Sequence, residues 1–170
     1  MNPIRLLLLA ILAGLTLGCS GYRLGPVDGS VAGARSIRIT YFENETLEPR
    51  IVEYVNRALR KEIQQDGTFV LSTRGDADVI LKGKITNYLR SAISFQPGDI
   101  QTARDYRLSL TATFEAIDTR TGKTVSSGSV DGRTTLRVGS DLGSAERQAG
   151  PLMAADLADK IASQLTEGSW

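Results

Sequence analysis

Apolar residues recur along this chain with two periods, which separate the predicted strands from the predicted helices. Residues 36–42 alternate between apolar and polar side chains, and this predicts a strand with Ile37, Ile39 and Tyr41 facing inward. The run 69–71 is a short strand-like segment. A longer strand is expected over residues 79–89, with an apolar face made of Val79, Leu81, Gly83, Ile85 and Leu89.

The clearest alternation lies between residues 106 and 116. One face of this predicted strand is apolar, and the other carries hydrogen-bonding groups such as Arg107 and Glu115. Residues 91–102, which precede it, are predicted to form a loop that turns at Pro97-Gly98-Asp99.

A hairpin turn at residues 118–123 is expected to lead into a further strand over 123–138. Val125 and Val130 fall on opposite faces of that strand. A bulge near Gly128 would bring both side chains to the same face.

A period of about four residues predicts two amphipathic helices. The first follows Pro49, with Asn44 or Thr46 as its N-terminal cap and Gly67 near its end. Its apolar stripe consists of Ile51, Val55, Leu59 and Ile63.

The last helical region is predicted to begin at a cap on Ser140 or Asp141 and to reach about Thr166. Gly150-Pro151 is expected to interrupt it, because proline removes one amide and clashes with the preceding turn. The apolar stripe beyond the proline consists of Met153, Leu157, Ile161 and Leu165.

The predicted elements follow the order β-α-β-β-β-α. Two amphipathic helices and a sheet with one apolar face favour an α+β fold, a two-layer sandwich in which the helices pack on one face of a four-stranded mixed sheet. We expect one domain over residues 35–166, followed by a short tail at 167–170.

The first 18 residues have the layout of a secretory signal peptide. Arg5 precedes an uncharged apolar run that is shorter than the roughly 20 residues needed to span a bilayer as a helix. The stretch that ends in Gly18 and Cys19 resembles a bacterial lipobox, although Thr16 stands where leucine is usual. The alternative is an ordinary signal followed by an incidental cysteine.

In a lipobox protein the cysteine sulfur carries a diacylglycerol and becomes the first residue after cleavage. We therefore expect residues 1–18 to be a lipoprotein signal peptide, Cys19 to be the lipid attachment site, and the glycine-rich residues 19–34 to be a lipid-anchored tether. Acyl chains on Cys19 would hold the protein at a membrane surface without a spanning helix.

Charge and composition narrow the function classes. Twenty Lys and Arg residues against 19 Asp and Glu leave a net charge of +1 without a run of like charges, so nucleic-acid binding is not expected. Histidine is absent and cysteine occurs once, which excludes Cys/His zinc sites, Ser-His triads and Cys-His dyads within this sequence. No cofactor is expected beyond the covalent lipid on Cys19.

An enzymatic function would have to use carboxylates alone. Candidates for such a pair are Asp76, Asp78, Asp105 and Glu115, and their spacing singles out no two of them. The sequence therefore indicates a protein that is not an enzyme.

Several segments, in their order along the chain, resemble the lipopolysaccharide-assembly lipoproteins (the LptE family). They are Cys19–Leu24, the Phe42-x-Asn44-x-Thr46-x-x-Pro49 segment before a helix, Ala77–Ile85, the strand over 107–114, and the alanine-rich last helix. The resemblance covers nearly the whole mature chain and implies two helices on a four-stranded sheet.

The resemblance also implies a function. Family members are lipoproteins on the periplasmic face of the outer membrane, where they plug and help assemble an LptD-like β-barrel that delivers lipopolysaccharide to the cell surface. Ser20, rather than Asp, beside Cys19 fits sorting to the outer membrane. A polar sheet face that includes Lys82, Lys84 and Arg107 would hydrogen-bond inside a polar barrel lumen, or would simply meet water.

Basic side chains near the mid-chain loop and before the last helix have been proposed to contact lipopolysaccharide phosphates in some family members. This sequence departs there, since residues 94–99 carry no cation and Ser140-Asp141 is not basic. Arginine binds phosphate in bidentate fashion, so other arginines are candidate replacements. The candidate contacts for the barrel or for lipopolysaccharide are Lys82, Lys84, Arg90, Arg104, Arg107 and Arg137.

An alternative function is a membrane-tethered periplasmic chaperone that binds lipid or peptide without a barrel. It would use the same polar sheet face or the groove beside the helices. The identity of the partner that co-purifies separates the two functions.

Overall fold

A computed structural model describes residues 35–139 and 141–167. The predicted signal peptide, Cys19, the tether, Ser140 as an alternative cap and residues 168–170 of the tail lie outside the described residues. The elements are β1 (Arg35–Ile39), β2 (Glu43–Asn44), α2 (Ile51–Asp66), β3 (Phe69–Leu71), β4 (Val79–Gln96), β5 (Asp99–Asp118), β6 (Thr124–Arg137) and α3 (Leu142–Thr166).

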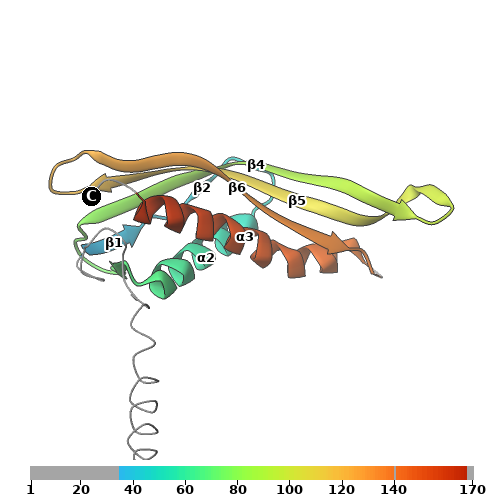
Figure 1. Cartoon of the computed structure of the whole chain (residues 1–170), viewed down its shortest axis with the longest axis horizontal. Coiled ribbons are helices and arrows are strands. Elements are labelled where there is room, and N and C mark those ends of the chain that lie inside the picture. Colours follow the sequence, from blue (N-terminus) through green and yellow to red (C-terminus); the bar gives the residue numbers. More distant parts are fainter. Residues whose placement is uncertain (1–34, 140, 168–170) are drawn as a thin grey trace, which may run out of the picture.

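The strands form one mixed sheet that is not closed, in the order β3-β1-β4-β5-β6. β1 runs parallel to β3 and β4, whereas β4, β5 and β6 pair antiparallel. The short β2 continues the pairing of β4 beyond the end of β1. Both helices lie on the same side of the sheet, and the β4–β5 hairpin extends past them (Figure 1).

This arrangement confirms the α+β class, the mixed sheet and the two helices on one face. The predicted four strands were too few, and the described residues contain six. The strand predicted over 36–42 ends at Ile39, and the separate short strand β2 follows at Glu43–Asn44. Residues 69–71 are a strand of their own at the sheet edge.

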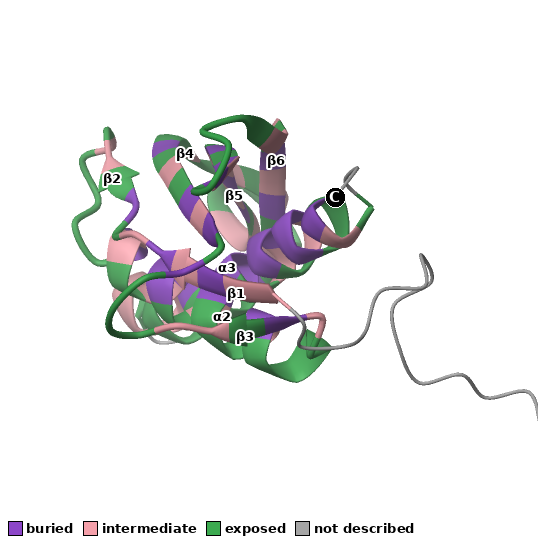
Figure 2. Ribbon diagram, turned by 90° about the vertical axis from the view of Figure 1, so that its left-hand side faces the viewer, coloured by how far each residue is buried: buried purple, intermediate pink, exposed green. Residues whose placement is uncertain are grey.

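The core lies between the sheet and the helices, and Figure 2 shows its buried residues gathered there. The predicted stripes on both helices are buried, as are the apolar residues of β5 from Leu108 to Ala116. Helix α3 approaches β6 closely at Gly132, where an added Cβ would lie 2.4 Å from the carbonyl oxygen of Met153. Phe42 covers Gly83 in the same way, with a ring carbon 2.1 Å from an ideal Cβ position.

Two predicted core residues face solvent instead. Tyr41 is 60% exposed and Phe42 is fully buried, because the strand ends at Ile39 and the alternation does not continue. Leu89 is 53% exposed, since the register of β4 against β5 shifts between Ile85 and Asn87. The shift reverses the alternation and turns Tyr88 toward the helices.

The predicted loop over 91–102 was also wrong. β4 continues to Gln96 and β5 begins at Asp99, so most of the stretch is paired strand. The turn at Pro97-Gly98 is confirmed, with Gly98 at a φ of 82°. Further register shifts between Ala92 and Gln96 remove the regular alternation by which a strand is recognised in sequence.

The bulge predicted near Gly128 lies elsewhere. Ala116 pairs with Ser126 and Ile117 with Thr124, so Val125 is the extra residue on β6. This position still reconciles the two valines, because Val130 is buried and Val125 packs against the edge of the core.

Helix α2 ends at Gly67, as predicted, but it has no side-chain cap at its start. Asn44 and Thr46 instead hold the preceding loop, where Asn44 Oδ1 accepts the Thr46 amide at 3.0 Å. The Asp141 cap of α3 is confirmed by bonds from the Gly143 and Ser144 amides.

The interruption predicted at Gly150-Pro151 was wrong. Helix α3 continues through the proline from Leu142 to Thr166. The buried Ala149 and Met153 flank the proline, and packing of this face on both sides stabilises the helix despite the missing amide hydrogen bond.

Candidate functional site

The sheet face opposite the helices, hereafter the open face, carries rows of polar side chains that follow from the strand register. One row is Lys84, Thr113 and Ser129, and another is Ser91, Arg107 and Thr135. The row nearest the hairpin tip is Ser94, Asp105 and Arg137. The prediction of a hydrogen-bonding face on β5 therefore extends to β4 and β6.

Hydrogen bonds join side chains within a row of the open face and between neighbouring rows. Thr111 Oγ1 donates to Asp131 Oδ1 at 2.7 Å, and Arg133 Nη2 lies 3.2 Å from Asp131 Oδ2. The Thr111 hydrogen bond, followed by Arg133, lowers the pKa of the Asp131 carboxyl below its ordinary value. The face is thus an ordered surface of hydroxyls and paired charges.

The two predicted lysines differ in their surroundings. Lys84 Nζ lies 2.9 Å from Glu43, the first residue of β2, and 3.6 Å from Glu45, which directly follows this strand. The Glu43 contact, followed by Glu45, raises the pKa of Lys84 above its ordinary value. Within residues 35–139 and 141–167, Lys82 and Arg107 are the two candidate residues that make no salt bridge, although Lys82 lies opposite Glu115 in the strand register.

Asp105 organises the distal end of the open face. Its carboxylate lies 2.8 Å from Arg137 Nε and 3.2 Å from Arg104 Nε, and it accepts a hydrogen bond from Ser94 Oγ. The Arg137 hydrogen bond, then Ser94 and Arg104, hold the pKa of Asp105 well below its usual range. Two of the six predicted contact residues are therefore already paired with one carboxylate.

Arg90 lies on the helix side of the sheet rather than on the open face. Its guanidinium binds Glu146 of α3 and lies 5.9 Å from the ring centre of Tyr106. The six predicted contacts thus do not form one cluster. Four share the open face in two groups, and Lys84 and Arg107 are separated by six register positions on β5, roughly 20 Å.

Sequence reasoning missed several surface residues. Arg133 and Asp131 belong to the open face, but the bulge at Val125 hid the phase of their strand. The hairpin beyond the helices also carries exposed apolar side chains, and Ile100 is the most exposed of them at 85%. The others are Ile93 and Phe95, and Leu89 is exposed on the open face of β4 before the hairpin.

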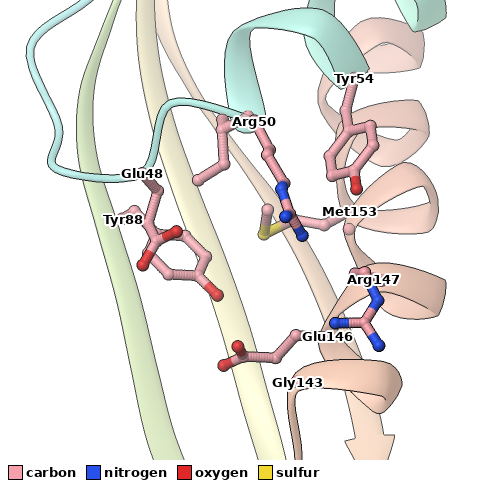
Figure 3. Close-up of a pocket in the computed structure, with 10 residues that line it drawn as sticks. Glu48, Arg50, Tyr54, Tyr88, Gly143, Glu146, Arg147 and Met153 are labelled. Carbon is pink, nitrogen blue, oxygen red and sulfur yellow. The ribbon is translucent and has the colours of Figure 1, made fainter.

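A small cleft of about 130 Å³ lies on the helix side, beside β4 (Figure 3). Arg50, at the start of α2, extends its guanidinium into this cleft and has no salt bridge within the described ranges. Burial, followed by Glu146 and Glu48, raises the pKa of Tyr88 to about 12. No sequence pattern pointed to this cleft, because its lining comes from the β2–α2 loop, α2, β4 and α3.

Three of the four candidate carboxylates, Asp78, Asp105 and Glu115, are hydrogen-bonded within the fold. Asp78 accepts hydrogen bonds from the Ser36 amide and hydroxyl, both at 2.7 Å, and Glu115 accepts one from Thr124. Asp105 lies ten residues from Glu115 on the same strand, which is roughly 33 Å. Over the part of the chain that the structure describes, no cluster of His, Cys, Asp and Glu could hold a metal ion.

The fold and its surface define a small α+β domain whose sheet is packed by helices on one face and presents an ordered polar surface on the other. The lipopolysaccharide-assembly (LptE) family model matches residues 34–165, so the chain belongs to that family. This match confirms the resemblance found in the sequence. In the described segments, no helix has the length and apolar character needed to cross a membrane.

Solved structures give a likeness in fold. The chain is similar to a protein from Xanthomonas campestris, with a TM-score of 0.57 and 10% identity over 85% of this chain and 92% of that one. A hypothetical protein from Chlamydia trachomatis has a TM-score of 0.54 and 8% identity, over 80% and 96% of the two chains. A putative lipoprotein from Caulobacter crescentus has a TM-score of 0.51 and 16% identity, over 75% and 89%. A search of the curated proteins found no match.

Proposed function

We propose that this protein is an outer-membrane lipoprotein of lipopolysaccharide assembly, anchored on the periplasmic side by acyl chains on Cys19. Its folded domain plugs a large LptD-like β-barrel and helps that barrel assemble. The domain acts by binding and does not catalyse a reaction. Membership of the lipopolysaccharide-assembly family supports a role in that process, and the polar open face supports a position of the domain inside the barrel.

The proposed plug role rests on the ordered polar surface on the side of the sheet that no helix covers. A barrel lumen is polar, so a lumenal domain needs a surface of hydrogen-bonding groups rather than an apolar one. Thr111, Thr113 and Ser129 present such groups between fixed charges. Lys82, which lies opposite Glu115 in the strand register, and Arg107 make no salt bridge among the described residues, so both side chains can pair with acidic groups of the lumen or with lipopolysaccharide phosphates.

Purification of the tagged, full-length chain from its own membranes in mild detergent tests this function. We expect a very large β-barrel protein to be recovered with the chain in fixed proportion. The double variant K82E/R107E should lower that recovery, while K61E on the exposed side of α2 should leave it unchanged. Clean recovery of the wild-type chain alone, able to capture lipid as a monomer, would contradict the plug and support the barrel-independent chaperone.

The lipid anchor has a separate test. Intact mass of the membrane-extracted chain should equal that of residues 19–170 plus acyl groups, and Cys19→Ala should remove the adduct. A mature chain without added lipid would contradict the proposed anchor.

A further inference from the structure

The cleft of Figure 3 is lined by charged groups of both signs. Its carboxylates belong to Glu48 and Glu146, and its guanidinium groups belong to Arg50 and Arg147. Figure 3 shows both carboxylates on the side of Tyr88, whereas the guanidinium groups lie toward helix α3. Burial, then Glu146 and then Glu48, raises the pKa of Tyr88, so both carboxylates act on the same side of the cleft. The cleft thus has an anionic half and a cationic half.

Two of these four charged groups are already paired inside the fold. Glu146 forms an ion pair with Arg90 of β4. Arg147 lies 3.9 Å from Asp141, the N-terminal cap of its own helix. These two charges are balanced by their neighbours, so they do not select what the cleft binds.

Glu48 and Arg50 are the unpaired charges of the cleft. In residues 35–139 and 141–167 they make no salt bridge with each other or with another group. The backbone beside them is fixed, because Asn44 Nδ2 donates to the Glu48 carbonyl at 3.1 Å and the Glu48 amide donates to Thr46 Oγ1 at 3.3 Å. Two opposite charges are therefore held beside one cleft without neutralising each other.

The lining between these charges is apolar and small. Ile51 and Met153 are 5% and 1% exposed, and the Tyr54 ring packs over Gly150, where an added Cβ would lie 2.7 Å from a ring carbon. The volume of about 130 Å³ is well below the roughly 300–1,000 Å³ of sites for drug-sized ligands. The cleft therefore fits a short group with a charge at each end and a few methylene carbons between them.

We propose that this cleft binds a short zwitterion, with an ammonium group at Glu48 and a phosphate at Arg50. Arginine binds phosphate through two parallel hydrogen bonds, and an ammonium group donates to carboxylates and is attracted to aromatic faces such as that of Tyr88. Phosphoethanolamine carries both groups on a short ethylene linker. It occurs as a phospholipid headgroup or as a free compound, and the lipid source rests on the proposed membrane anchor.

A titration of the full-length, acylated chain in non-ionic detergent tests the site. The probe is glycerophosphoethanolamine, which is the phospholipid headgroup without its acyl chains. Isotope-labelled glycine reports on the cleft by NMR, because Gly143 and Gly150 belong to its lining. The amide signals of these two glycines should shift to saturation, while that of Gly122 in the turn before β6 should not move.

Probes with a single charge test the need for both groups. Glycerol phosphate keeps the anion and ethanolamine keeps the cation. Each should bind at least about tenfold more weakly than glycerophosphoethanolamine, which is the effect of losing one hydrogen bond to a charged group.

Variants with matched controls assign the two charges. Glu48→Gln and Arg50→Gln should each weaken binding of glycerophosphoethanolamine at least about tenfold. Glu53→Gln and Arg57→Gln make the same chemical changes at exposed positions of α2 outside the cleft and should leave binding unchanged. Thermal melting confirms that each variant is folded.

Nanodiscs distinguish the two sources of the zwitterion. The acylated chain is placed in discs of phosphatidylcholine, whose ammonium has no N–H donor, with or without phosphatidylethanolamine. A lipid source predicts that the Gly143 and Gly150 signals are already shifted in the discs with phosphatidylethanolamine. Equal spectra in both discs, with binding of the free probe intact, would overturn the lipid source and assign the cleft to a free zwitterion.

Other results would overturn the site itself. They are an absence of any shift at Gly143 and Gly150, an equal affinity for glycerol phosphate, or undiminished binding in both Glu48→Gln and Arg50→Gln. None of these results bears on whether a barrel co-purifies with the chain. Conversely, recovery of the wild-type chain without a barrel would contradict the proposed function and leave the zwitterion site standing.

Discussion

Strands β4 and β5 pass through two regions that differ in how they are covered. In the first region helices α2 and α3 pack on one face, and residues such as Leu110 and Ala112 are fully buried. In the second, the hairpin beyond Ser91, pairing between the strands continues but large apolar side chains are exposed. The same pair of strands is thus stabilised by a hydrophobic core in the first region, whereas in the second region its apolar side chains remain exposed for contact with a partner.

In this fold, strands β4 and β5 pair with each other whether or not their side chains are buried. Packing determines stability in the helix-covered region, so substitutions there should be costly. In the hairpin the surface side chains contribute little to stability, and their positions suit binding.

Truncating one large apolar side chain in each region should give very different results. Leu110→Ala removes a fully buried side chain and should lower the free energy of unfolding by about 2–5 kcal/mol. Ile100→Ala removes a side chain of the same size that is 85% exposed in the hairpin, and it should cost less than about 1 kcal/mol. Urea unfolding followed by circular dichroism measures both values. Equal losses would show that the hairpin has a core of its own.

The close approach of α3 to β6 should be sensitive to one methyl group. In Gly132→Ala the new Cβ would lie 2.4 Å from a backbone oxygen, so a loss of about 1–3 kcal/mol in unfolding free energy is expected. Gly139 has no atom within 4 Å of its Cβ position, and Gly139→Ala should change stability by less than about 0.5 kcal/mol. Unfolding of the two variants at the same urea concentration would contradict the close contact between α3 and β6 at Gly132.

The ion pair between Arg90 and Glu146 connects β4 to α3, next to the hairpin. Both side chains remain partly exposed, at 44% and 26%, so solvent screening limits their contribution. Arg90→Gln should cost about 0.5–1 kcal/mol, measured by urea unfolding. Arg107→Gln is the control, because Arg107 makes no salt bridge in the described ranges, and its effect should be smaller.

The Asp105 cluster should give the smallest effect, visible as a pH dependence. The pKa of Asp105 is depressed in the folded state, first by the Arg137 hydrogen bond. Its contribution to stability is therefore complete above the unfolded-state pKa of about 4 and is lost as the pH falls below it. The difference in melting temperature between wild type and Asp105→Asn should be constant from about pH 7 to 5 and should shrink below about pH 4. A difference that does not change with pH would contradict the role of the charge.

The sequence predicted most of the helix-covered region, because burial there imposes strict periods. The stripe of Ile51, Val55 and Leu59 and the alternation from Leu108 to Ala116 were both confirmed by burial. Errors arose where backbone irregularities shift the phase, at the residue after Ile85 and at Val125. A period of two cannot be recognised across an inserted residue.

The candidate site was less predictable for a different reason. Which cations share a face follows from strand alternation, so Lys82, Lys84 and Arg107 were placed correctly on the open face. Which of them are paired depends on contacts between distant segments, as between Arg90 and Glu146, which are 56 residues apart. Their roles in binding the barrel or lipopolysaccharide stay predictions.

Amine labelling tests most directly whether the open face meets the partner. Lys82 on the open face and Lys61 on α2 are both exposed in the isolated domain, so a lysine-reactive reagent should modify both in the purified chain without its partner. In the complex extracted from native membranes, the account predicts that modification of Lys82 falls strongly while that of Lys61 persists. Equal modification of Lys82 with and without the co-purified barrel would contradict the central claim.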